Sequence, residues 1–190
     1  MSYTNKTLEE LNVLDDFLMN AIVTTPVLGE AFCRSVLTVL LQRKINKINI
    51  ISQRIVPPFT PDLRGIRMDV EVLEYADDLS DEVTEIYDIE PNLRRNVNLP
   101  KHNRFYQAKI DGRHLKSGDE SFDNMPNLYV ITITNYDPFG HDYMMYRIRN
   151  CCQEIPELIY DDGLEFLYFY TGGHRGGNDN IKAMLNYFQN

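Results

Sequence analysis

Two β-like segments, residues 66–75 and 85–91, lie on either side of a short polar stretch. The first, IRMDVEVLEY, alternates apolar and polar side chains, which is typical of a strand with one buried face. The second, EIYDIEP, has a similar pattern, and the intervening ADDLSDEVT is rich in residues that favour turns. We therefore predict an antiparallel hairpin with an acidic loop, around which the rest of the chain has to fold.

The spacing of apolar residues predicts the other elements. Predicted helices cover 7–22, 26–44, 103–117 and 180–190, and predicted strands cover 45–52, 127–135, 143–150 and 164–171. Pro26 is well placed to begin a helix, and the helix over 103–117 would turn Phe105, Ala108 and Leu115 toward the core. Helices that flank and interrupt a run of strands indicate an α/β or α+β fold with a mixed sheet.

Length and composition limit the class of protein. The 190 residues can form one domain with a full core, and 43% hydrophobic with 25% charged residues is ordinary for a soluble globular protein. No apolar run approaches the roughly 18 residues of a membrane helix, and the first residues do not resemble a signal peptide. Cys33, Cys151 and Cys152 form no disulfide framework and no C-x-x-C, so we expect a reduced, cytoplasmic protein without membrane association.

The charged residues are unevenly distributed. Residues 69–90 contain ten acids and no base, whereas residues 94–116 contain seven Lys or Arg and a single acid, Asp111. Carboxylates that hold divalent cations, next to bases that contact a phosphate backbone, would account for this pairing. Two solvated faces of opposite sign are the plainer interpretation, which the charge pattern alone favours. The net charge of −9 argues against nucleic-acid binding through overall charge.

Polar side chains recur at every second position of the return strand, at Asp88, Glu90 and Asn92, so they share one face. In an antiparallel hairpin, the residue numbers of any two opposed residues add up to the same value. If Asp69 lies opposite Glu90, the centre of the turn falls inside the predicted loop. These two carboxylates can therefore lie roughly 5 Å apart, where they repel unless a cation or proton lies between them. Mg²⁺ or Mn²⁺ would suit this pair, with the Pro91 carbonyl as a third ligand.

The alternative is that this face is the solvent-exposed side of an edge hairpin. The three polar residues would then simply meet water, with Arg67 and Glu71 opposite them. Pro91 cannot donate to a ladder and is typical of an edge strand or a bulge. Spacing alone favours this alternative over a metal site.

Five motifs occur in a fixed order: DDF at 15–17, GIRMDV at 65–70, IYDIEPN at 86–92, RFYQAKID at 104–111 and VITITNYDPFG at 130–140. In them the chain resembles the PD-(D/E)XK nuclease family transposases, also called the recombination-promoting nuclease family. The resemblance implies a restriction-endonuclease-like α/β fold, with a mixed central sheet flanked by helices, over residues 1–172. A Gly-rich linker and a C-terminal helix would follow at 173–190. The implied activity is Mg²⁺-dependent hydrolysis of DNA phosphodiester bonds.

The same resemblance assigns roles at the hairpin. Asp69 and Glu90 correspond to the metal ligands of the family. Asn92 occupies the position that usually holds glutamine, or lysine in the wider superfamily, and would orient the attacking water. Gln107 would lie near the site as a further catalytic residue. Asparagine keeps the amide but cannot supply the positive charge of lysine.

Other residues would complete the site. Arg94, Lys101 and Arg104 would contact the DNA backbone, although a surface salt bridge is an equally good interpretation of Arg104. An acid from the first helices, Asp16 or Glu30, can join the metal site in related nucleases.

Two other functions remain open from the sequence. The acid-rich surface and the residues at 91 and 92 favour a nuclease-fold protein that no longer cleaves, acting as a nucleic-acid-binding or regulatory module. An interaction protein that forms a homo-oligomer is the other.

Overall fold

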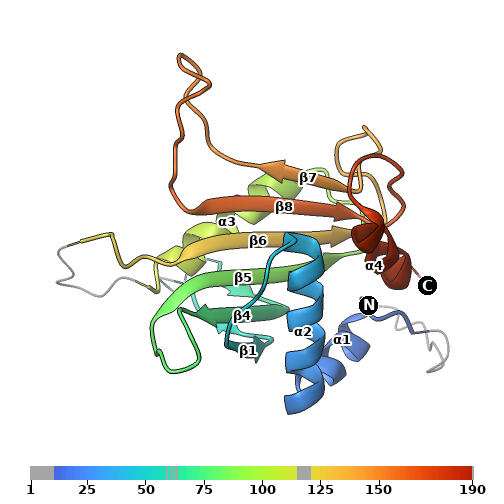
Figure 1. The fold of residues 1–190 in the computed structure, drawn as a ribbon, viewed down its shortest axis with the longest axis horizontal. Coiled ribbons are helices and arrows are strands. Elements are labelled where there is room, and N and C mark those ends of the chain that lie inside the picture. The colour runs from blue at the N-terminus through green and yellow to red at the C-terminus, as the bar shows by residue number, and fades with distance from the viewer. Residues whose placement is uncertain (1–10, 59, 61, 63, 115–120, 190) are drawn as a thin grey trace.

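The computed structural model describes residues 11–58, 60, 62, 64–114 and 121–189. Its centre is a mixed six-stranded sheet with helices on both faces (Figure 1). In spatial order the strands are β1 (Ile48–Ser52), β4 (Val70–Tyr75), β5 (Val83–Asn92), β6 (Asn127–Thr134), β8 (Leu164–Tyr170) and β7 (Met145–Ile148). The predicted α/β class with a mixed central sheet is confirmed.

The predicted hairpin is formed by β4 and β5. Their antiparallel register pairs Val70 with Ile89, and the same register continued by one residue sets Asp69 opposite Glu90. The turn region spans residues 76–82, as the composition predicted. The predicted register of the two strands is confirmed.

The hairpin is not at an edge of the sheet, so the edge alternative is wrong. On its other side β5 pairs in parallel with β6, whose apolar, β-branched residues are buried, and the edges are β1 and β7. Pro91 lies beyond the described β4–β5 pairing, in register with Ile133 of β6. Its missing N–H therefore interrupts none of the β4–β5 pairs.

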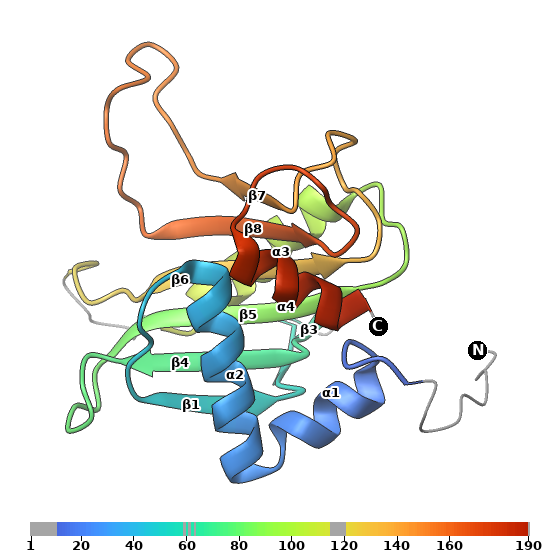
Figure 2. The ribbon, with the colours of Figure 1, turned by 45° about the vertical axis from the view of Figure 1, so that its right-hand side comes forward.

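Three helices cover one face of the sheet: α1 (Asp16–Val23), α2 (Pro26–Leu41) and α4 (Asp179–Gln189) (Figures 1 and 2). Their buried side chains pack with Tyr87 and Ile89 of β5 in one apolar cluster. The opposite face carries α3 (Leu99–Asp111) and a ribbon of β2 (Ile55–Val56) and β3 (Ile66–Arg67). A second cluster there contains Ile86, so the even-numbered residues of β5 point toward α3.

The helix α3 begins earlier than predicted and buries another face. It starts at Leu99, with proline in its first turn, and turns Leu99, Asn103, Tyr106 and Ile110 inward. Phe105 is 36% exposed and Ala108 is exposed, so the predicted core face is wrong for both. Leu115 lies outside the described residues.

The C-terminal helix α4 is part of the main body. Ile181, Leu185 and Phe188 are buried in the same cluster as residues of α1 and α2. The Asn178 side chain caps the helix by accepting a hydrogen bond from the Ile181 N–H. The expected linker also contacts the main body, because the Arg175 carbonyl accepts a hydrogen bond from the Met144 N–H. These contacts join residues 173–189 to the main body.

In the described part of the chain, no single helix has the length and apolar character needed to cross a bilayer. Helices α1 and α2 reach that length and composition only as a pair, with a 111° bend between them.

Candidate metal centre

Asp69 and Glu90 meet at the end of the sheet where β4 begins and β5 ends. The Asp69 backbone N–H donates a hydrogen bond of 2.9 Å to Glu90 Oε1. Glu90 is 7% exposed, and Asp69 is half-buried. The structure therefore places the two acids that the sequence singled out side by side at one end of the sheet, joined through the backbone of Asp69.

A third acid, Asp88, lies behind Glu90 and is fully buried. The carboxyl groups of Asp88 and Glu90 are neighbours, and each affects the pKa of the other. Among the described residues, no hydrogen-bond partner reaches either side-chain oxygen of Asp88. Three acids thus lie close together at one end of the sheet, and no cationic side chain is hydrogen-bonded to Asp88. Burying ionised carboxylates without such a partner is energetically unfavourable.

The crowding changes the proton affinity of all three acids. Burial and the nearby charge of Asp16 raise the pKa of Asp69 to about 6. Burial, with the charges of Glu71 and Asp69, raises the pKa of Asp88 to about 8. Burial and the charges of Asp88 and Asp69 also raise the pKa of Glu90 well above its ordinary value. A cation among these groups would favour their ionised forms, because opposite charge lowers a carboxyl pKa.

Helix α1 contributes Asp16 to this region. Asp16 lines a small cavity with Asp69 and Pro91, together with Met19, Asn20 and Gln53. Its volume is about 10 Å³, close to the least that one water molecule requires. The other acid considered, Glu30, is ion-paired with Arg34 on the surface of α2 and is not brought to the site.

Asn92 is held by a short chain of hydrogen bonds. The Asn96 N–H donates to Tyr136 Oη at 3.1 Å, and the Tyr136 hydroxyl donates to Asn92 Oδ1 at 2.9 Å. Because the tyrosine oxygen accepts from a backbone amide, its proton is free to go to asparagine. With this assignment the amide oxygen of Asn92 faces Tyr136, and Nδ2 is the group that can donate elsewhere.

The predicted DNA-contacting residues are all exposed. Arg94 follows β5 directly, and Lys101 and Arg104 lie on α3. The first turns of α3 lie close to the acidic end of the sheet, since Asn103 Nδ2 donates to Thr132 Oγ1 at 2.8 Å and Thr132 is the β6 partner of Glu90.

Gln107 is not brought to the carboxylates. Its amide donates to Asp111, one turn further along α3. The helix faces the site through Tyr106 instead.

Tyr106 and Tyr136 are the site residues that sequence reasoning missed. The Tyr106 hydroxyl donates to the Arg67 carbonyl at 3.2 Å. Burial, then the charges of Glu90, Asp88 and Asp69, raise the pKa of Tyr106. The sequence contained no clear signal for Tyr106, because the helix face that it shares with Asn103 is set by a contact with Thr132 of β6.

Glu71 has a different role, although it shares the α3 side of the sheet. It is 1% exposed, and its carboxylate pairs with Arg54 and Arg113, each at 2.5 Å. These pairs connect β4 with the residue directly before β2 and with the turn that follows α3. We interpret Glu71 as a structural residue.

The donor set at this end of the sheet fits a hard divalent cation. Asp69 and Glu90 offer carboxylate oxygens, Pro91 offers a carbonyl, and Mg²⁺ keeps several waters when it binds one or two carboxylates. Across the described ranges, no three His, Cys, Asp or Glu side chains form a ready metal-binding group. A cation here would therefore depend on two carboxylates, the carbonyl and water.

The comparisons with known proteins return nothing. A scan against models of protein families, a search of curated proteins and a search of solved structures each find no match.

Proposed function

We propose that this chain is a Mg²⁺- or Mn²⁺-dependent DNA endonuclease with a restriction-endonuclease-like fold, of the recombination-promoting nuclease type. The observation that carries the proposal is that Asp69 and Glu90 lie together at one end of a mixed sheet, where the Asp69 backbone N–H donates a hydrogen bond to the Glu90 carboxylate. Helices on both faces of that sheet also agree with the motif resemblance. The reduced cytoplasmic setting expected from the cysteines belongs to the same proposal.

Each residue of the site would have a separate role. Asp69 and Glu90 would hold the cation, with the Pro91 carbonyl beside them. When bound, a divalent cation lowers the pKa of a coordinated water and neutralises charge on the phosphate. Asn92 Nδ2 would donate to the attacking water or to a phosphate oxygen, since Tyr136 occupies its carbonyl.

Exposed bases would keep the DNA in place. Arg94, Lys101 and Arg104 would each neutralise a backbone phosphate, so binding would weaken steeply with added salt. Such contacts orient DNA without reading its sequence.

Cleavage of supercoiled plasmid DNA tests the proposal. Wild type should nick DNA with Mg²⁺ or Mn²⁺ and not with EDTA. Asp69→Asn and Glu90→Gln should each reduce the rate by about a hundredfold or more, because each removes charge from the metal site. The matched control is Glu30→Gln, an exposed acid on α2 that pairs with Arg34. Cleavage that is indifferent to Asp69→Asn would contradict the assignment.

A nuclease-fold module that binds nucleic acid without cleaving it is the second candidate. The observation that favours it is at Asn92, where a short amide tied to Tyr136 stands in the position of a lysine or glutamine. This candidate predicts salt-sensitive DNA binding by fluorescence anisotropy, no cleavage by wild type, and unchanged affinity for Asp69→Asn. Cleavage gained by Asn92→Lys would show that only the third catalytic residue is lacking.

A further inference from the structure

The long connection between β7 and β8, residues 149–163, extends away from the body in both ribbon views (Figures 1 and 2). We call it the arm. Its exposed side chains include Ile155, Leu158, Ile159 and Tyr160, at 55%, 51%, 88% and 57% exposure. Loops of this length are uncommon in compact domains and are often functional. Four large apolar side chains within six residues of solvent-exposed loop require an explanation.

The arm has a defined shape. Asn150 Nδ2 donates to Asp162 Oδ2 at 2.6 Å and joins its two sides near the base. The Leu158 N–H donates to the Ile155 carbonyl at 3.0 Å and makes a turn near the tip. Ordering this segment on a partner would therefore cost less entropy than ordering a free chain.

A groove on the helical face has complementary character. It lies between α2 and α4, has a volume of about 560 Å³, and is lined mainly by Leu28, Phe32, Val39, Ala183, Met184 and Tyr187. Leu28 is 52% exposed and Tyr187 is 58% exposed. We call it the α2–α4 groove. It is large enough for several apolar side chains.

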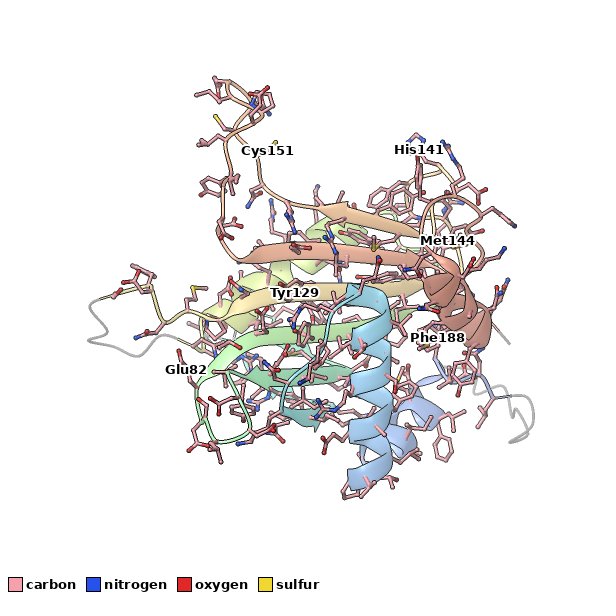
Figure 3. The ribbon with its side chains drawn as sticks, viewed as in Figure 1. Glu82, Tyr129, His141, Met144, Cys151 and Phe188 are labelled. Carbon is pink, nitrogen blue, oxygen red and sulfur yellow. The ribbon has the colours of Figure 1, made fainter. Side chains whose placement is uncertain are left out.

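The arm does not fill its own groove. It precedes β8 and α4 follows that strand, whose seven residues span roughly 23 Å. In Figure 3 the arm, marked by Cys151, lies well apart from Phe188 on α4. The arm of one molecule therefore lies away from that molecule's own groove.

We propose that the arm of one copy inserts into the α2–α4 groove of a second copy, and that two copies exchange arms reciprocally to form a closed dimer. The arm carries four acids, Glu154, Glu157, Asp161 and Asp162, and one base, Arg149. This composition disfavours nucleic acid or an anionic membrane as the partner. A second copy supplies the apolar surface that the arm matches.

The area agrees with a stable dimer. If each of the four apolar side chains buries roughly 100 Å² of its own surface and the same area of the groove, each arm accounts for about 800 Å². Two arms in two grooves then bury about 1,600 Å² over both copies, which is the size of a standard protein interface. The exchange is isologous, so it closes after two copies and does not build a fibre.

Oligomeric state tests the proposal, by size-exclusion chromatography with light scattering on the full chain. Wild type should be a dimer at micromolar concentration. Ile159→Lys in the arm and Tyr187→Lys in the groove should each raise the dimer Kd at least tenfold. The matched control is Leu79→Lys, which places the same charge on a 96% exposed leucine of the β4–β5 loop and should leave the dimer intact.

Each outcome decides the matter. A monomeric wild type, a larger open assembly, or a dimer sensitive to Leu79→Lys as much as to Ile159→Lys overturns the proposal. So does a dimer that responds to only one of the two variants. Circular dichroism checks folding, and Leu28→Lys replaces Tyr187→Lys if the latter does not fold.

A crosslink identifies the contact directly. A photoreactive benzophenone residue at position 159, in a mixture of isotope-labelled and unlabelled copies, should crosslink to residues 28–39 or 180–187 of the other copy. Crosslinks within one copy, or to another surface, overturn the proposal. None of these tests depends on nuclease activity.

Discussion

Asp88→Asn is expected to stabilise the folded chain at neutral pH. Asp88 is fully buried, and its carboxyl oxygens lack hydrogen-bond partners among the described residues. Burial and neighbouring charges raise its pKa to about 8. Asparagine has the same shape and no charge, and its amide can donate to the Glu90 carboxylate. The substitution removes the cost of keeping a proton that the unfolded chain would release.

The magnitude follows from linkage. Between the ordinary value of 3.8 and about pH 8, the folded chain holds a proton at Asp88 that the unfolded chain has lost. Stability therefore falls as pH rises through this window, by about 1.4 kcal/mol for each pH unit. From pH 5 to pH 7 the free energy of unfolding of the wild type should fall by roughly 3 kcal/mol because of this group. Asp88→Asn should not show this decrease.

Urea unfolding followed by circular dichroism at pH 5, 6 and 7, with EDTA present, measures the effect. The free energies of the variant and wild type should diverge as pH rises, with the variant more stable at pH 7. The control, Asp78→Asn, changes an exposed acid in the β4–β5 loop, and its free energy of unfolding should change with pH as that of the wild type does. Parallel curves for Asp88→Asn, or a variant less stable at pH 7, would refute the buried-acid reasoning.

Three further substitutions test the packing and charge networks by the same unfolding measurement. Glu71→Ala should cost about 2–3 kcal/mol, because it leaves two partly buried arginines without their partner, whereas Glu30→Ala on the surface of α2 should cost at most about 0.5 kcal/mol. Gly29→Ala should cost about 2 kcal/mol or more, since its Cβ would lie 2.4 Å from the Val23 carbonyl oxygen. Leu37→Ala, at a fully buried position, should cost about 3 kcal/mol. Equal losses for Glu71→Ala and Glu30→Ala, or tolerance of either core change, would contradict these assignments.

Much of the hairpin could be predicted because its information is local. Alternation along β4 and β5 and the composition of the loop were enough to set Asp69 opposite Glu90. The same alternation placed Asp88 on the face of Glu90, although burial of that face was not expected.

The rest depends on contacts between distant segments. The position of β5 inside the sheet comes from its pairing with β6, some forty residues later, which turns an apparent solvent face into a buried one. Likewise, α3 buries Asn103 because Thr132 accepts its hydrogen bond, a partner that helical periodicity cannot reveal. Tyr136 reaches Asn92 across the end of the sheet for the same reason.

The proposed nuclease requires a divalent cation shared by Asp69 and Glu90. The direct measurement is anomalous diffraction at the manganese edge from crystals soaked in Mn²⁺. We expect one peak bound by the carboxylates of both residues, with the Pro91 carbonyl nearby, and no such peak in Asp69→Asn crystals. Ordered carboxylates with no manganese between them at saturating Mn²⁺ and neutral pH would contradict it.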